Sequence, residues 1–305
     1  MPAASGAWRS TRWIVLSACC FGSVPPLTVL ATNDGASLPT VQLWRYATSA
    51  LLLGLLAARA RQRDPAVRAT SAPWRRPDIT LLGGGAQFLV AALSLSALRW
   101  LPAATVGFLF YTYPAWVTLL SAVRGIEVVS RTRVLALVLA LAGVAGMVGT
   151  PGGAPLAPIG IALALAAALV YAVYIPTMSV RQRGLTPLGV AHAVAMGGTL
   201  WFVAWSAVSG VLFEAPSARV VVLGVSMGVL TALAFLGFLT GLAGLGPVRS
   251  AIMSTIEPVW TALLGLVLLA QPLGIGTIIG GSGILAAVIL LQRKPRAAST
   301  RAAST

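Results

Sequence analysis

The feature that most constrains this chain is a series of about ten apolar runs, each close to the length needed to cross a bilayer. A helix rises about 1.5 Å per residue, so about 20 residues cross roughly 30 Å of hydrocarbon. Lipid offers the backbone no hydrogen-bonding partners, and the runs lack the alternation of barrel strands, so we expect helices. The predicted spans are 13–31, 40–58, 79–98, 102–123, 133–150, 157–179, 188–212, 219–242, 247–269 and 273–291.

The composition supports an integral membrane protein. Of the 305 residues, 58% are hydrophobic and 9% are charged. Soluble domains are about half apolar and about a quarter charged. The sequence therefore predicts an all-α integral membrane fold with ten transmembrane helices.

The net charge of +15 is explained by topology rather than by a nucleic-acid site. If the chain starts in the cytoplasm and crosses ten times, most of its 21 basic residues lie on the cytoplasmic side. These residues are Arg9, Arg12, Arg59, Arg61, Arg63, Arg68, Arg75, Arg76, Arg124, Arg131, Arg133, Arg181, Arg183, Arg293, Lys294, Arg296 and Arg301. The loops on the other side hold Arg99 and Arg219. The positive-inside rule thus predicts cytoplasmic termini, and we expect a bacterial inner-membrane protein.

Two segments of the chain resemble each other at a fixed offset. Adding 144 to the residue number places "YPAWVTLL", which starts at Tyr113, on "EPVWTALL", which starts at Glu257. The shared proline and tryptophan are the informative matches. With the linker "TPGGAPLAP" between them, the segments predict two repeats, residues 1–150 and 151–292, followed by a basic disordered tail, 293–305.

Each repeat contains five spans, and this odd number determines their relative orientation. The second repeat enters the membrane from the opposite side, so the two repeats are inverted relative to each other. The two Pro-x-Trp segments then meet near the bilayer midplane. Inverted repeats with interrupted helices around a midplane site are typical of secondary transporters.

Glu257 is the most informative polar residue in the apolar runs. It shares one helix face with Ser250, Ser254 and Thr261. The next residue, Pro258, lacks a backbone N–H and interrupts the helix. A carboxylate inside the membrane faces protein or water rather than lipid. Glu257 either binds a substrate amine or carries a coupling proton, or it holds two helices together; both interpretations are open.

Further candidates surround this position. Arg45, in the second span, binds a substrate carboxylate, pairs with Glu257 or extends toward the membrane surface. Pockets for small organic molecules are mostly apolar and aromatic, with a few polar anchors. The candidates for such a lining are Tyr111, Tyr113, Trp116, Tyr171, Tyr174, Trp260, Ser254 and Gln87. Helix kinks are expected at Pro114, Pro258 and Pro176.

Three stretches carry a family resemblance. They are "VQLWRY", which contains Arg45; "ALRWLPAATVGFLFYTYPAWVTLLSAVRGIE", with Pro114 and Glu127; and "GLAGLGPVRSAIMSTIEPVWTALLGLVLLAQ". In these stretches the chain resembles the drug/metabolite transporter superfamily, in its EamA-type ten-helix branch. The resemblance implies a secondary transporter, with export of metabolites or amino acids as the commonest activity. The chain departs from the pattern at Gln271, where the family usually has Glu.

Together these features predict a transporter that exports a small organic metabolite by alternating access. Neutral amino acids, aromatic ones included, are the preferred substrates, with Glu257 on the amine and Arg45 on the carboxylate. The transport alternatives are efflux of cationic or lipophilic drugs and movement of nucleobases or sugars. A membrane enzyme or a non-transporting scaffold is the alternative of another class.

Several kinds of chemistry lack a motif in this sequence. A Walker loop and a Cys/His cluster with metal-ligand spacing are both missing. We therefore expect no enzymatic activity, no metal, no cofactor and no nucleic-acid partner. Proton coupling and facilitated diffusion both remain open, as do a monomer and a homodimer.

Overall fold

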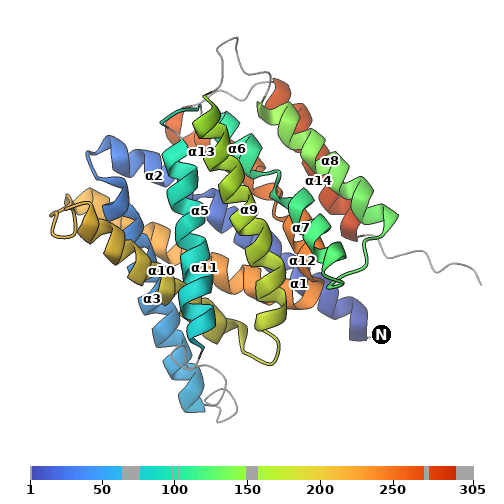
Figure 1. The fold of residues 1–305 in the computed structure, drawn as a ribbon, viewed down its shortest axis with the longest axis horizontal. Helices are drawn as coiled ribbons and strands as arrows, with labels where there is room; N and C mark the ends of the chain where they lie inside the picture. Colours follow the sequence, from blue (N-terminus) through green and yellow to red (C-terminus); the bar gives the residue numbers. More distant parts are fainter. Residues whose placement is uncertain are drawn as a thin grey trace, which may run out of the picture.

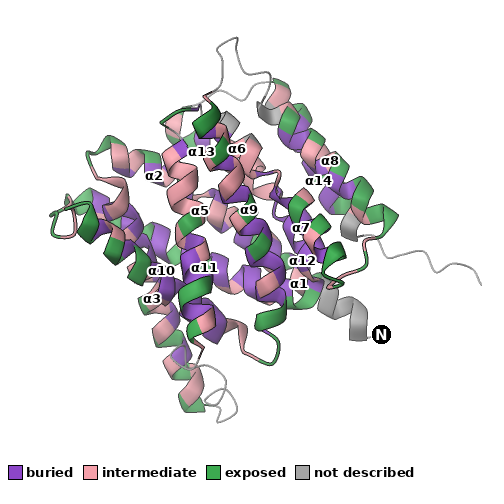
Figure 2. Ribbon diagram, viewed as in Figure 1, coloured by how far each residue is buried: buried purple, intermediate pink, exposed green. Residues whose placement is uncertain are grey.

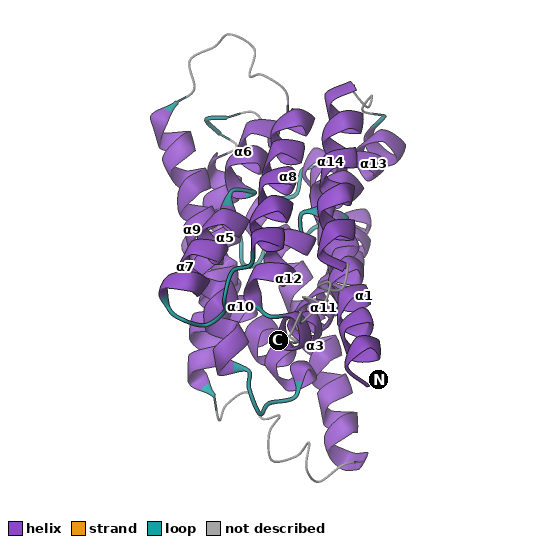
Figure 3. Ribbon diagram, turned by 90° about the vertical axis from the view of Figure 1, so that its right-hand side faces the viewer, coloured by secondary structure: helices purple, strands orange, loops and turns teal. Residues whose placement is uncertain are grey.

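The computed structural model describes residues 2–63, 76–97, 99–101, 103–148, 157–270 and 275–292. Within these residues every regular element is helical. Most of the helices run roughly parallel or antiparallel in one bundle, as Figure 3 shows. The all-α prediction is confirmed. Gln271, most of the linker and the tail 293–305 lie outside the described residues.

The first half of the bundle contains eight of the described helices (Figure 1). They are α1 (Pro2–Gly22), α2 (Val24–Asn33), α3 (Leu38–Arg63), the π-helix η2 (Asp78–Gly83), α5 (Gly84–Ala97), α6 (Ala103–Phe110), α7 (Tyr113–Val123) and α8 (Arg131–Val148). Three of the membrane-crossing segments are built from two consecutive helices each. They are α1 with α2, η2 with α5, and α6 with α7.

The second half follows the same plan. Its helices are α9 (Pro158–Arg181), α10 (Pro187–Val208), α11 (Ala218–Leu245), α12 (Pro247–Met253), α13 (Ile256–Leu269) and α14 (Ile275–Gln292). Here α12 and α13 together form one crossing segment. In the described part of the chain, the helices thus make up ten segments, five before the linker and five after it.

The outer surface of the bundle is apolar. Seven helical segments of the described chain are long and apolar enough to cross a membrane, and Tyr113–Val123 and Ile278–Leu290 are shorter apolar helices. Apolar side chains such as Leu51, Leu82 and Val267 are exposed. The buried stretches of the ribbon lie mostly toward the middle of the bundle (Figure 2). In a membrane, these outer side chains contact lipid.

The helices of the two halves pair across the bundle in a regular pattern. α1 packs on α11 and α5 packs on α9. These are the same contact made twice, because each joins the first helical segment of one half to the third segment of the other. The second segments, α3 and α10, pack on each other, and so do the last, α8 and α14. This pattern is expected of two inverted repeats related by a pseudo-twofold axis.

Glycines allow the closest of these contacts. A Cβ atom added to Gly84 in α5 would lie 2.4 Å from the backbone of Gly197 in α10. One added to Gly143 in α8 would lie 2.6 Å from the Gly280 carbonyl in α14. Small residues let membrane helices approach closely, and the contacts between apolar helices depend on such packing.

Three crossing segments are interrupted inside the bundle. The breaks lie at Ser23, at Tyr111–Thr112 and at Ser254–Thr255. A proline follows each break within about one turn, where its missing N–H leaves no further donor unpaired. By contrast, α9 runs from Pro158 to Arg181 without a break, although it contains Pro176.

Candidate functional site

The break before α13 places Glu257 in the first turn of that helix. A carboxylate is favourable there because the helix N-terminus carries partial positive charge. The preceding residues Met253, Ser254 and Thr255 are fully buried, whereas Glu257 is only partly buried. The Tyr111 hydroxyl, at the equivalent break of the first half, lies within hydrogen-bonding reach of the Glu257 carboxylate.

Arg45 is held deep in the bundle by neutral groups. Its side chain is 9% exposed. Nε donates to Thr231 Oγ1 in α11 at 2.7 Å, and Nη1 donates to Gln42 Oε1 at 3.0 Å. The guanidinium carbon lies 5.1 Å from the centre of the Tyr46 ring, a cation–π distance.

Arg45 and Glu257 attract each other without forming an ion pair. Each charge influences the other electrostatically. The ion pairs among the described residues nevertheless join other partners, with Asp34, Asp78 and Glu127 as their acids. The site therefore holds one acidic and one basic side chain, which the bundle keeps apart.

A cluster of aromatic rings lies around Glu257. Its members belong to one core and come from α6, α7, α9, α11 and the α6–α7 break. We call them the tyrosine cluster: Phe110, Tyr111, Tyr113, Tyr171, Tyr174 and Phe238. The Tyr113 and Tyr171 ring centres are 4.8 Å apart, and Tyr171 stacks on Tyr174 at 5.8 Å. These separations are those of favourable aromatic pairs.

Some predicted site residues lie outside this cluster. Trp116 is 38% exposed on the outer part of α7. The Trp260 indole donates to Ser23 Oγ at 2.9 Å, and the Thr261 hydroxyl donates to the Gly22 carbonyl at 2.8 Å. These two bonds fasten α13 to the break between α1 and α2. Ser254, by contrast, reaches the cluster: it donates to the Ser250 carbonyl of α12 at 2.9 Å and lies within hydrogen-bonding reach of the Tyr113 hydroxyl.

Gln87 lies next to the tyrosine cluster. It is a buried residue of α5, close to Tyr174. Thus the structure brings together Glu257, Tyr111, Tyr113, Tyr171, Tyr174, Ser254 and Gln87, with Arg45 nearby. Within the described residues, Trp116 and Trp260 make no ring contact with this group.

Other residues of the site were not predicted from the sequence. Gln42 and Thr231 hold Arg45, and Tyr46 packs under it. Gln42 has a signal, because it lies three residues before Arg45 and so on the same helix face. Thr231 has no such signal, because it is 186 residues away in the chain.

Glu127, which carries part of the family resemblance, joins two segments of the bundle. Its carboxylate accepts a hydrogen bond from the Val248 N–H at 3.1 Å and pairs with Arg133 at 2.8 Å. Val248 lies in the first turn of α12, where backbone N–H groups lack helical partners. Glu127 thus links the end of α7 to the start of α12. No group of three metal-binding side chains occurs in the described chain.

Comparisons with known proteins agree with this architecture. A model of the EamA-like transporter family matches residues 9–149 and 158–293. The chain is 29% identical to an uncharacterized transporter of Archaeoglobus fulgidus over 293 residues, which cover 92% of this chain and 95% of the relative. A solved crystal structure is 23% identical with a TM-score of 0.72, covering 94% of this chain and 98% of the other. That structure supports the fold alone.

Proposed function

Because the chain belongs to the EamA-like transporter family, we propose that it exports neutral amino acids, with aromatic ones preferred, by alternating access. One observation carries this proposal. A single carboxylate, Glu257, and a single buried guanidinium, Arg45, lie beside tyrosines of one core without contacting each other. An amino acid carries an ammonium group and a carboxylate group, which complement these two side chains, attached to one carbon atom.

The chemistry of the two charged groups suits a zwitterion. A carboxylate accepts charge-assisted hydrogen bonds from an ammonium group, and a guanidinium binds a carboxylate with two parallel bonds. Within the described residues, Arg45 uses Nε and Nη1 for Thr231 and Gln42 and makes no hydrogen bond through Nη2. A bound zwitterion would neutralise both charges, each of which is costly to keep unpaired in a membrane.

The tyrosine cluster supports the preference for aromatic side chains. Its rings offer flat apolar surfaces, and several of its hydroxyl groups lie near Glu257. Binding pockets that combine aromatic walls with a few polar anchors select by both shape and charge. Movement between inward- and outward-open states would use the breaks beside Glu257 and Tyr113 as hinges.

A second candidate is efflux of lipophilic cations. The observation that favours it is that Arg45 already has neutral hydrogen-bonding partners and needs no substrate carboxylate. In that case Glu257 and the faces of the tyrosine rings would bind the cation. Nucleobases and sugars, which carry no fixed charge, would need neither residue.

Flux into proteoliposomes tests the proposal. Radiolabelled phenylalanine, a lipophilic cation, a nucleobase and a sugar are supplied with and without a proton gradient. Comparison of wild type with Glu257→Gln tests the carboxylate, and Glu214→Gln is the matched control, because Glu214 lies in a loop beside Ser37 and Thr40. Phenylalanine flux that is lost only in Glu257→Gln supports amino-acid transport. Flux of the cation alone supports the second candidate.

We further propose a bacterial inner-membrane location with both termini in the cytoplasm. The support is the distribution of basic residues, most of which flank the spans on one side. Reaction of single introduced cysteines with a membrane-impermeant thiol reagent in intact cells tests this orientation. A cysteine in the loop near Gly210 should react from outside, and one in the loop near Gly184 should be protected.

A further inference from the structure

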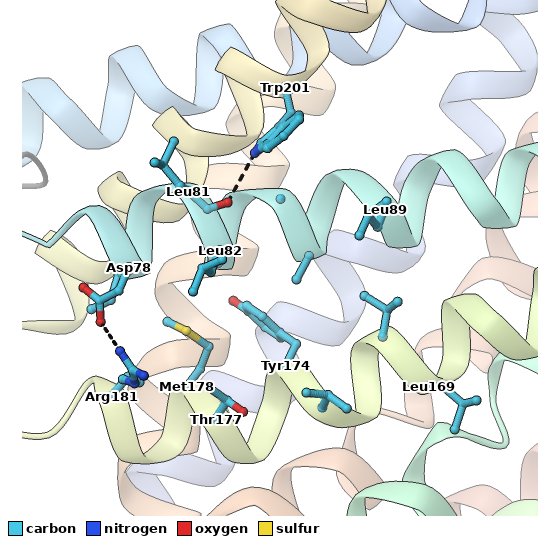
Figure 4. Close-up of a pocket in the computed structure, with 16 residues that line it drawn as sticks. Asp78, Leu81, Leu82, Leu89, Leu169, Tyr174, Thr177, Met178, Arg181 and Trp201 are labelled. Carbon is cyan, nitrogen blue, oxygen red and sulfur yellow. Dashed lines mark hydrogen bonds and ion pairs between the residues drawn. The ribbon is translucent and has the colours of Figure 1, made fainter.

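A concave site lies on the lipid-facing side of the bundle, away from Glu257, between η2, α5 and α9 (Figure 4). Its volume is about 600 Å³. The residues along its length are mainly apolar, with leucine the commonest. They include Leu81, Leu82, Leu89, Leu169 and Val173, all of which are 44–69% exposed. An exposed groove of this composition, inside a membrane, has the acyl chains of lipids as its natural neighbours.

One end of the groove is charged. Asp78 and Arg181 line it, and their side chains form an ion pair at 2.6 Å (Figure 4). The same carboxylate pairs with Arg76 at 2.9 Å. Arg124 reaches this end as well, because it donates to the hydroxyl of Thr177, which lines the groove, at 3.3 Å. One carboxylate is thus surrounded by more than one guanidinium, and the end keeps a positive charge.

The wall of the groove has an unusual backbone. Residues Asp78–Gly83 form a π-helix rather than an α-helix. Such segments are rare and are often found at functional sites. The Trp201 indole of α10, which also lines the groove, donates to the Leu81 carbonyl at 3.2 Å and so supports this wall.

We propose that this groove is a binding site for an anionic phospholipid. Its phosphate would lie at the guanidinium groups of Arg76, Arg124 and Arg181, and one acyl chain would lie along Leu82, Leu89 and Val173. The match of charge is the argument for this occupant, because basic pockets at the ends of membrane helices attract anionic headgroups. A neutral lipid would have no use for the arginines.

Lipid titration followed by native mass spectrometry tests the proposal in delipidated wild-type protein. Phosphatidylglycerol is compared with phosphatidylcholine of the same chains and with glycerol 3-phosphate, which has the charge but no acyl chain. We expect phosphatidylglycerol to bind at least about five times more tightly than the other two ligands. Equal binding of the two lipids, or equal binding of glycerol 3-phosphate, would overturn the proposal.

Three variants locate the binding. Arg181→Gln should weaken phosphatidylglycerol binding several-fold. Arg183→Gln, two residues further along and in the turn after α9, should leave it unchanged. Asp78→Asn distinguishes an electrostatic effect on binding from a loss of structure. It removes the carboxylate that neutralises the arginines, so it should strengthen binding. A general loss of structure at this end would weaken it instead. Weakening in Asp78→Asn, or equal effects of the two arginine variants, would contradict the proposal.

The alternative occupant is a lipophilic substrate on its way to the centre. The groove offers a route, because Tyr174 lines it and also stacks on Tyr171. A substrate there would compete with phosphatidylglycerol, whereas a bound structural lipid would persist when transported substrate is added. Displacement of the lipid by phenylalanine or by a lipophilic cation would overturn the lipid assignment.

Discussion

Tyr113 and Glu257 occupy equivalent positions in the two repeats, 144 residues apart. Each lies at the start of a helix that follows a break, and a proline and then a tryptophan come next in both copies. The backbone plan is therefore shared, but one copy presents a phenol and the other a carboxylate. The comparison teaches that an inverted repeat can keep a helix break in both halves while only one half places a carboxyl group beside the break.

The largest expected effect comes from removing that charge. Glu257→Gln should lower amino-acid flux by at least about tenfold, because an amide loses the charge-assisted bonds to the ammonium group. Tyr113→Phe removes only a neutral hydroxyl, which bonds to the Ala251 carbonyl at 3.4 Å and lies within reach of Ser254, and should lower flux by about twofold or less. Initial rates in proteoliposomes measure both. Equal losses in the two variants would mean that the repeats share the chemistry.

The next effect concerns Arg45, the basic group that the first repeat supplies, while the second repeat supplies Glu257. Arg45→Gln should reduce phenylalanine flux by about tenfold and leave flux of phenylethylamine, which lacks the carboxylate, nearly unchanged. Arg45→Lys should recover only part of the phenylalanine flux, since an ammonium group cannot bind two carboxylate oxygens in the planar manner of arginine. Similar losses for both compounds would assign Arg45 a purely structural role.

A smaller effect is expected at the two prolines, where the copies should behave alike. Pro114→Ala and Pro258→Ala each restore a backbone donor and favour a more continuous helix. Each should slow transport several-fold with little change in the affinity for substrate, because a hinge affects movement rather than binding. Substrate-concentration series in proteoliposomes separate the two parameters. A change confined to affinity would argue against hinges at these positions.

The smallest effect separates the two tryptophans. Trp260→Phe loses the hydrogen bond to Ser23 and should lower the melting temperature by a few degrees, since such a bond is worth about 1 kcal/mol. Trp116→Phe, at the partly exposed equivalent position, should leave the melting temperature unchanged. Thermal unfolding in detergent gives the comparison. It is followed with a thiol-reactive dye whose fluorescence does not depend on tryptophan. Equal shifts would show that both copies use this residue in packing.

Much of the fold could be predicted because the bilayer sets strict requirements on the sequence. Each crossing needs an apolar run of a certain length, and the basic loops and the Pro-x-Trp repeat arrange these runs in two related halves. The breaks near Pro114 and Pro258 follow from a proline in an otherwise helical run. At Pro176 the helix α9 continues without a break, so the kink expected there stays a prediction.

The side-chain arrangement of the site was less accessible to sequence reasoning. Membrane helices are apolar on both their lipid-facing and protein-facing sides, so hydrophobic periodicity gives little information on how each helix is rotated. For this reason Trp116 and Trp260 looked like equivalent lining residues, although one is partly exposed and the other bonds to Ser23. The Arg45–Thr231 bond joins distant segments, and only the packed bundle brings them together.

The most direct test of the central claim is calorimetric binding of phenylalanine, phenylethylamine and phenylpropionate to the purified protein. The account predicts that wild type binds phenylalanine tightest, by about tenfold or more over either analogue. Glu257→Gln should bind phenylalanine no better than phenylpropionate, and Arg45→Gln no better than phenylethylamine. If wild type binds phenylethylamine as tightly as phenylalanine, Arg45 does not bind the substrate and the site recognises cations.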